Sequence, residues 1–308
     1  MSAPVVATTG LTRDYGQGAG IFDVDLAVPA GSVYGLVGPN GAGKTTLLSI
    51  VTGLRRADRG EVRLGVDRRR VAVCADVPEF EPWLTATEVV ELAAGLVRDA
   101  DGASTGPSDR RAVAEALGRA GLTEAADRRV GGFSRGMTQR LGLAAALVGD
   151  PEVLVLDEPT SALDPAGRAE VLDLVVGMRG RTTVIFSSHI LGDVQRVCDT
   201  VGVLRAGRLL YQGGLDRLLA EHVRPRWAVR LRSGSERLVA ALGAEPWVVQ
   251  AEPADGQTVH VEARTLAEGE HGVVATAAAL GLAVVSLTPL EADLESAFLS
   301  LTHAAVAR

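Results

Sequence analysis

Hydrophobic positions in the first 75 residues fall into short runs separated by glycine turns. Residues 32–38, SVYGLVG, form an apolar run that predicts a buried strand entering a glycine-rich loop. Residues 44–53, KTTLLSIVTG, have helical character, and Gly53 is the kind of residue at which helices end. The pattern therefore predicts a strand, a glycine loop and a helix in direct succession.

The spacing of apolar residues becomes helical over about residues 85–148, which predicts an inserted helical block. A polar loop over residues 98–109 interrupts it. We expect three helices: one from the TATE capping box at residues 85–88 to about Val97, one over residues 110–121 that ends at Gly121, and one after Ser134.

Short apolar runs then return, with helical patterns between them, at residues 153–157, 182–188 and 200–204. Strands that alternate with helices are typical of a parallel sheet. Residues 1 to about 215 are therefore predicted to form an α/β domain with a mainly parallel sheet and the helical block inserted into it.

The composition shifts beyond about residue 215, and residues 216–308 predict a separate small domain. Strand and helix patterns follow in the order β-α-β-β-α-β, with the second helix from about Glu270 and a further helix from Glu291 to about Ala304. This order suits a split β-α-β domain of the α+β class. It contains no phosphate loop and no spacing of metal ligands.

Composition narrows the classes of function. The 308 residues carry a net charge of −7, which argues against a nucleic-acid-binding protein. Cys74 and Cys198 lie in apolar runs and are expected to be buried, reduced thiols. We expect no signal peptide at the N-terminus, and we interpret the apolar residues 272–290 as core, because their alanine, glycine and threonine content is too polar for a membrane span.

The loop between the first strand and helix has the sequence GPNGAGKT, which matches the phosphate-binding pattern G-x-x-x-x-G-K-[ST]. Its glycines allow successive backbone N–H groups to surround phosphates. Lys44, the only lysine among 31 basic residues, is suited to the β- and γ-phosphates, and the Thr45 hydroxyl to Mg²⁺. The predicted nucleotide-binding residues are Gly38, Pro39, Asn40, Gly41, Ala42, Gly43, Lys44, Thr45 and Thr46.

Two carboxylates and a histidine follow later strands. In VLVLDEPTSALD, Asp157 ends an apolar run and is suited to holding magnesium, while Glu158 is placed to act as a general base for water. Adjacent carboxylates at a strand end can also form a solvated turn, and a single histidine such as His189 is often structural. Together with a phosphate loop, they favour a catalytic site in which His189 contacts the γ-phosphate.

The helix after Ser134 has an unusual first turn. Ser134 can cap the helix, but Met137 stands where a capping box has Glu or Gln. The turn carries Arg135 and no carboxylate, so it suits an anion supplied from elsewhere.

The order of phosphate loop, helical block, Ser-x-Gly, LVLDEPTSALD and strand-His resembles the ATP-binding-cassette (ABC) ATPases over residues 1 to about 215. The resemblance implies a P-loop NTPase core and two cassettes that sandwich two ATP molecules. It places Ser134 and Gly136 against the γ-phosphate bound by the partner cassette, Asp164 across the interface, and Tyr15 against adenine.

Two positions depart from the family pattern. The signature, commonly L-S-G-G-Q, reads FSRGM here, so Arg135 adds a charge of unassigned target. Asp76 stands where the family usually has a glutamine that helps to hold magnesium and links the site to the membrane partner. We expect Asp76 to alter coupling rather than to abolish activity.

The resemblance implies an ATP-hydrolysing subunit of a transporter that works as a homodimer or with a related second ABC subunit. It also implies separate transmembrane permease subunits and a place at the cytoplasmic face of the cell membrane. The family docks its membrane partner near residues 77–92, where Phe80 and Trp83 either fill that groove or belong to the core. The tail LESAFLSLT, residues 294–302, is similar to exporters of the multidrug and antibiotic-resistance type. The alternative is a soluble ABC ATPase acting on ribosomes or nucleic acid, which the single phosphate loop, the lack of a heptad run and the acidic charge disfavour.

Overall fold

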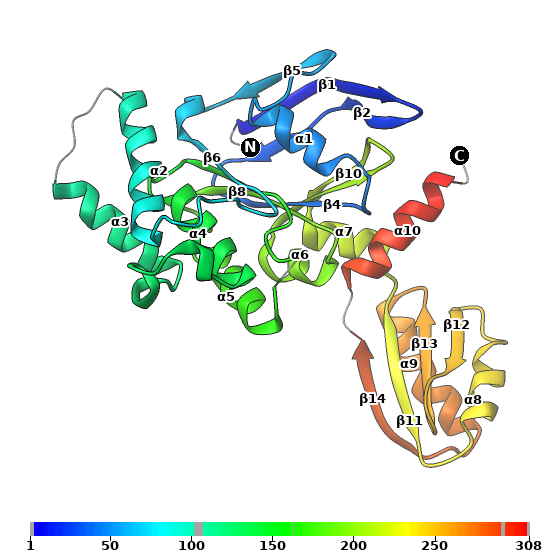
Figure 1. Ribbon diagram of the computed structural model, residues 1–308. Helices are drawn as coiled ribbons and strands as arrows, with labels where there is room; N and C mark the ends of the chain where they lie inside the picture. Colours follow the sequence, from blue (N-terminus) through cyan, green and yellow to red (C-terminus); the bar gives the residue numbers. More distant parts are fainter. Residues whose placement is uncertain (1–2, 102–106, 162, 291–292, 307–308) are drawn as a thin grey trace. The chain divides into compact units, whose positions relative to one another are not determined.

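The computed structural model describes residues 3–101, 107–161, 163–290 and 293–306 (Figure 1). The chain divides into two compact units, Met1–Leu215 and Asp216–Arg308. Each unit has a buried hydrophobic core of its own.

A six-stranded sheet forms the centre of the first unit. Its strands lie in the order β10 (Arg208–Gly214), β9 (Thr200–Arg205), β4 (Val33–Val37), β8 (Thr183–Ser188), β7 (Val153–Leu156) and β6 (Val71–Cys74). Neighbouring strands are parallel except for the β9–β10 pair. The predicted α/β class with a mainly parallel sheet is confirmed.

A second, antiparallel sheet lies above the first in Figure 1, and the sequence patterns did not predict it. It consists of β1 (Pro4–Gly16), β2 (Ala19–Val24), β3 (Ala27–Pro29) and β5 (Arg59–Leu64). Helix α1 (Lys44–Val51) packs with this sheet and with β4, β7 and β8 in one buried cluster. Gly53 follows α1 with a positive φ of 82°, as a helix-ending glycine requires.

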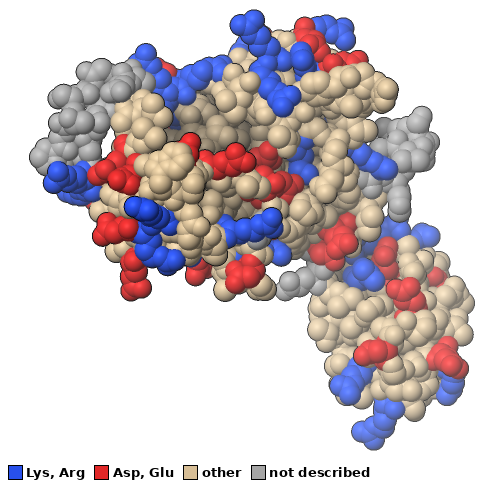
Figure 2. All heavy atoms as spheres, viewed as in Figure 1, with Lys and Arg blue, Asp and Glu red and all other residues tan. Residues whose placement is uncertain are grey.

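Helices α5 (Pro165–Val176) and α6 (Leu191–Val197) complete the α/β unit, and α6 packs on β4 and β8. In the described part of the chain, the 3₁₀ turns η1 (Arg68–Arg70), η2 (Thr123–Ala125) and η3 (Val130–Gly132) connect other elements. Figure 2 shows acidic and basic side chains interspersed over the visible face, with basic ones gathering over β5.

The helical block contains α2 (Ala86–Asp101), α3 (Pro107–Arg119) and α4 (Arg135–Leu147) around one apolar cluster. The TATE capping box is confirmed, since the Thr85 N–H donates to Glu88 Oε2 at 2.7 Å and the Glu88 N–H donates to Thr85 Oγ1 at 3.2 Å. The loop expected over residues 98–109 was too long at both ends, because α2 continues to Asp101 and Pro107 begins α3, a position that proline favours. Residues 102–106 lie outside the described part of the chain.

The second unit has the expected β-α-β-β-α-β order, followed by a helix. Its antiparallel sheet has the strand order β12 (Val248–Pro253), β13 (Thr258–Ala263), β11 (Arg226–Leu231) and β14 (Val284–Leu290). Its helices are α7 (Leu215–His222), α8 (Ser235–Leu242), α9 (Leu266–Ala279) and α10 (Leu294–Val306).

Two helix starts in the second unit differ from the sequence prediction. Helix α9 begins four residues before Glu270, because the Thr265 side chain accepts the Glu268 N–H and caps an earlier turn. Helix α10 begins at Leu294 rather than Glu291, and residues 291–292 lie outside the described part of the chain. No helix among the described residues is long and apolar enough to cross a membrane.

A close helix–sheet contact in the second unit generates a stability prediction. Trp227 is 1% exposed, and a Cβ added at Gly269 on α9 would lie 2.0 Å from its ring. Gly269→Ala is therefore expected to lower the free energy of unfolding of this unit by about 1–3 kcal/mol, because the buried ring must shift. Thermal unfolding measures the stability of the second unit, and ATP binding measures whether the first unit is unaffected.

The matched control is Gly118→Ala on α3, where the added Cβ would meet only Thr123 Oγ1 at 3.7 Å. We expect no loss of stability from it. An unchanged melting transition for Gly269→Ala would contradict the packing of α9 on Trp227.

Candidate active site

The phosphate loop joins the buried strand β4 to α1, and its backbone requires glycine at particular positions. Gly43 caps α1 with φ 103°, and a Cβ there would lie 2.7 Å from Ile21 Cγ2. A Cβ at Gly38 would lie 2.2 Å from the Leu204 carbonyl oxygen. The first turn of α1 has no acidic residue, so the partial positive charge of its N–H groups is available to an anion.

Lys44 is the first residue of α1, and its side chain is only 6% exposed. Its Nζ donates to the Gly38 carbonyl oxygen at 2.7 Å and lies 3.0 Å from Glu158 Oε1. The ammonium group therefore lies inside the loop and faces a carboxylate that follows β7.

Glu158 lies between Lys44 and His189. Its second oxygen, Oε2, is 2.7 Å from His189 Nδ1 and also accepts the His189 N–H at 3.3 Å. Burial raises the pKa of the Glu158 carboxyl, but the hydrogen bonds and charges of Lys44 and His189 lower it more, so its pKa lies below the usual value. The carboxylate is consequently ionised at neutral pH.

Backbone geometry at Glu158 depends on a serine that sequence analysis missed. Glu158 has a positive φ of 48°, which is uncommon for a residue with a side chain. Ser187 Oγ accepts the Glu158 N–H at 2.9 Å and donates to Asp157 Oδ1 at 2.6 Å. Ser187 is fully buried, and its only sequence signal is its place two residues before His189.

The residues predicted to hold Mg²⁺ come from three elements. Thr45 is exposed in the first turn of α1, Asp157 follows β7, and Asp76 follows β6, where its Oδ1 accepts the Ser161 hydroxyl at 2.5 Å. The described residues contain no cluster of three or more His, Cys, Asp or Glu side chains that could hold a metal. A hydroxyl and few carboxylates nevertheless fit Mg²⁺, which takes its remaining ligands from phosphates and water.

Tyr15 is 44% exposed and contacts two arginines. The Arg13 guanidinium carbon lies 5.2 Å from the ring centroid, and Arg55 donates to the Tyr15 hydroxyl at 3.1 Å. The ring is therefore outside the core, where a planar base can reach it.

Ser134 and Asp164 both cap helices. Ser134 Oγ accepts the Met137 N–H at 3.3 Å at the start of α4, and Asp164 Oδ1 accepts the Gly167 N–H at 3.0 Å at the start of α5. A Cβ at Gly136 would lie 3.6 Å from the Leu163 side chain, so the two helix starts are neighbours. Among the described residues, neither cap hydrogen-bonds to the phosphate loop.

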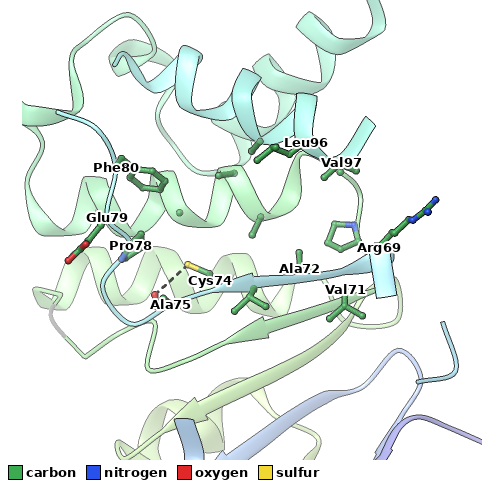
Figure 3. Close-up of a pocket in the computed structure, with 17 residues that line it drawn as sticks. Arg69, Val71, Ala72, Cys74, Ala75, Pro78, Glu79, Phe80, Leu96 and Val97 are labelled. Atoms are coloured by element: carbon green, nitrogen blue, oxygen red, sulfur yellow. Dashed lines mark hydrogen bonds between the residues drawn. The ribbon is translucent and has the colours of Figure 1, made fainter. Parts of the chain in front are cut away.

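A groove of about 420 Å³ lies in the first unit between β6, α2 and α4 (Figure 3). It is mainly apolar, and its lining includes Cys74, Pro78, Phe80, Leu96, Val97 and Ala146. Phe80 also packs against the core of the helical block, whereas Trp83 is 63% exposed. The two aromatic residues thus differ: Phe80 is partly core and lines the groove, and Trp83 is not in the core.

Comparisons with known proteins identify the family. The ABC transporter family profile matches residues 21–161. The ABC transporter ATP-binding protein YxlF of Bacillus subtilis is 37% identical over 251 residues, covering 79% of this chain and 81% of that protein. The daunorubicin resistance ATP-binding protein DrrA3 of Streptomyces coeruleorubidus is 34% identical over 320 residues, covering 98% and 97%.

The solved structures agree. CbiO1 of Clostridium perfringens, part of the ABC transporter complex cbiONQ, has a TM-score of 0.61 at 26% identity, covering 71% of this chain and 92% of that one. A phosphate loop that faces an ionised carboxylate and a histidine is consistent with ATP binding and hydrolysis. The chain therefore belongs to the ABC transporter ATP-binding proteins and is an ATP-hydrolysing subunit of that family.

Proposed function

We propose that Glu158, held between Lys44 and His189, is the general base for the water that attacks the γ-phosphate of ATP. The contacts of 3.0 Å and 2.7 Å on its two oxygens carry this proposal, since they keep the carboxylate ionised and fix its direction. With ATP bound, the γ-phosphate competes with Glu158 for Lys44, which leaves one carboxylate oxygen to accept a proton from water. His189 holds the other oxygen and contacts the phosphate.

The other predicted site residues are proposed to bind ATP and Mg²⁺. Backbone N–H groups of Gly38 and of residues 40–46 bind the phosphates, Pro39 having none, and Tyr15 stacks on the adenine ring. Thr45 and Asp157 hold Mg²⁺, with Asp76 contributing through its own carboxylate or a water molecule. When bound, Mg²⁺ neutralises charge on the phosphate oxygens.

A second ABC subunit completes each site, with a second copy of this chain as the simplest partner. The exposed start of α4, which carries Ser134 and Gly136, supports this assignment, because a helix start without acidic residues is suited to a γ-phosphate held by another chain. Asp164 lies at the neighbouring exposed start of α5. Arg135 adds a further positive charge there.

Separate transmembrane permease subunits dock in the groove between β6, α2 and α4 at the cytoplasmic face of the membrane. The apolar lining of the groove supports this proposal, as does the contribution of Pro78, Glu79 and Phe80 from the segment that follows Asp76. Similarity over nearly the full chain to a daunorubicin resistance protein favours export as the direction of transport.

Glu158→Gln tests the proposed base. We expect ATP binding to persist and kcat for hydrolysis to fall at least about 100-fold, because an amide cannot accept the proton. Steady-state hydrolysis and nucleotide binding are the measurements. Glu152→Gln, at the other end of β7 and paired with the partly exposed Arg70, is the control and should keep wild-type kcat. Normal turnover in Glu158→Gln would contradict the role.

Asp76→Gln restores the residue usual in the family and tests the metal assignment. We expect the Mg²⁺ concentration for half-maximal hydrolysis to rise about tenfold, because a neutral amide replaces a carboxylate near the ion and attracts it less. Asp150→Asn, an exposed carboxylate elsewhere in the unit, should change nothing. An unchanged magnesium dependence and unchanged transport-coupled hydrolysis in Asp76→Gln would remove Asp76 from the site.

Leu96→Glu tests the groove, since Leu96 is 66% exposed and lines it. A tagged Glu158→Gln chain, purified from its own cells after mild detergent extraction, is expected to recover a polytopic membrane protein. Adding Leu96→Glu should remove most of that recovery without reducing ATP binding, because a charge then faces an apolar surface.

Leu54→Glu is the matched control, as Leu54 is 73% exposed and does not line the groove. Equal recovery with Leu96→Glu and Leu54→Glu would move the docking surface elsewhere. Recovery of ribosomes or nucleic acid without a membrane protein would overturn the transport proposal.

A further inference from the structure

Behind the active site, one buried carboxylate joins three segments that carry proposed functional residues. Asp193, on α6, is 2% exposed. Its Oδ2 accepts the Thr160 hydroxyl at 2.7 Å, and its Oδ1 accepts Nε and Nη2 of Arg168, each at 2.6 Å. Both carboxylate oxygens are therefore bound, which offsets the cost of burying the charge.

Each partner comes from a different part of the site. Thr160, also 2% exposed, lies two residues after Glu158. Arg168 lies on α5, one turn after the cap Asp164. Asp193 itself lies four residues after His189, on the helix that begins directly beyond it.

Ser187 joins the same two loops from the other side. Ser187, on β8, accepts the Glu158 N–H, and Asp193, on α6, accepts the Thr160 hydroxyl. The loop after β7 is therefore bound to β8 at Glu158 and to α6 at Thr160. The loop that carries His189 lies between these same two attachments, Ser187 and Asp193. A residue with a positive φ, such as Glu158, is held in its strained conformation only when its surroundings over-determine it.

We propose that Asp193 is a positioning residue that sets the distance between Glu158 and His189, through Thr160 on one oxygen and Arg168 on the other. Through Arg168, the same carboxylate couples that distance to α5 and thus to Asp164, at the proposed interface with the second subunit. The inference rests on the roles proposed for Glu158 and His189. It assigns no contact with ATP to Asp193, Thr160 or Arg168.

Thr160→Val tests the proposal, because it removes one hydrogen bond while keeping the side-chain volume and the Asp193–Arg168 pair. We expect kcat to fall about ten- to hundredfold, since a small displacement of a catalytic group has an effect of that size. The KM for ATP should stay within about twofold of the wild-type value, because no proposed phosphate contact is changed. Thr160→Ser keeps the hydroxyl and should restore kcat.

Asp173→Asn provides a matched control. Asp173 on α5 also pairs with an arginine on α6, Arg196, at 2.7 Å, but both side chains are exposed. Its removal should leave kcat, the KM for ATP and the unfolding temperature unchanged. This comparison separates the buried contact from α5–α6 ion pairing in general.

Glu158→Gln, measured alongside, distinguishes the two proposals. Normal ATP turnover in Glu158→Gln would overturn the proposed role of Glu158 as the base, on which the inference about Asp193 rests. If Glu158→Gln is inactive and Thr160→Val keeps wild-type kcat, the positioning role of Asp193 is overturned. A fall in kcat for Thr160→Ser equal to that for Thr160→Val would also overturn it, because the hydroxyl would then not be the group that matters.

Discussion

The proposed active site depends on one carboxylate, Glu158, whose two oxygens contact Lys44 and His189. None of these three residues is close to another in sequence, and the parallel sheet brings them together. Strands β4, β8 and β7 are neighbours, with Val37 paired to Ser188 and Leu156 to Phe186. Because parallel strands end at the same edge, the phosphate loop, the histidine and the carboxylates emerge side by side.

Much of this arrangement was predictable from sequence because its signals are local. The glycine loop between a strand and a helix, the carboxylates after an apolar run and the TATE capping box are each contained in about ten residues. The α/β class follows from their order, since alternating strands and helices favour a parallel sheet. These predictions required no knowledge of which strands are neighbours.

The features that escaped prediction depend on long-range pairing. The antiparallel sheet combines a local β1–β2 hairpin, in which Gly16 pairs with Ala19, with the long-range pairing of β1 and β5, for which no local pattern exists. Ser187 and Asp193 are ordinary residues in the sequence, and their importance follows from contacts with Asp157, Glu158 and Thr160 about 30 residues away. Phe80 and Trp83 differ in burial because the loop before α2 turns only one of them toward the helical core.

Lys44 and Glu158 are largely covered by protein, and buried polar groups support them from behind, while other predicted site residues face solvent. Ser187 and Asp193 lie below the surface with their hydrogen bonds satisfied, whereas His189 and Tyr15 are exposed. This division suits a subunit that must hold its catalytic groups rigidly and still admit ATP and a second chain.

The most direct measurement is a structure of the Glu158→Gln chain with ATP and Mg²⁺. We expect Lys44 and His189 to contact the γ-phosphate, with the side chain at position 158 beside it and a water between them in line for attack. A γ-phosphate bound away from His189 and position 158 would contradict the roles proposed for both residues.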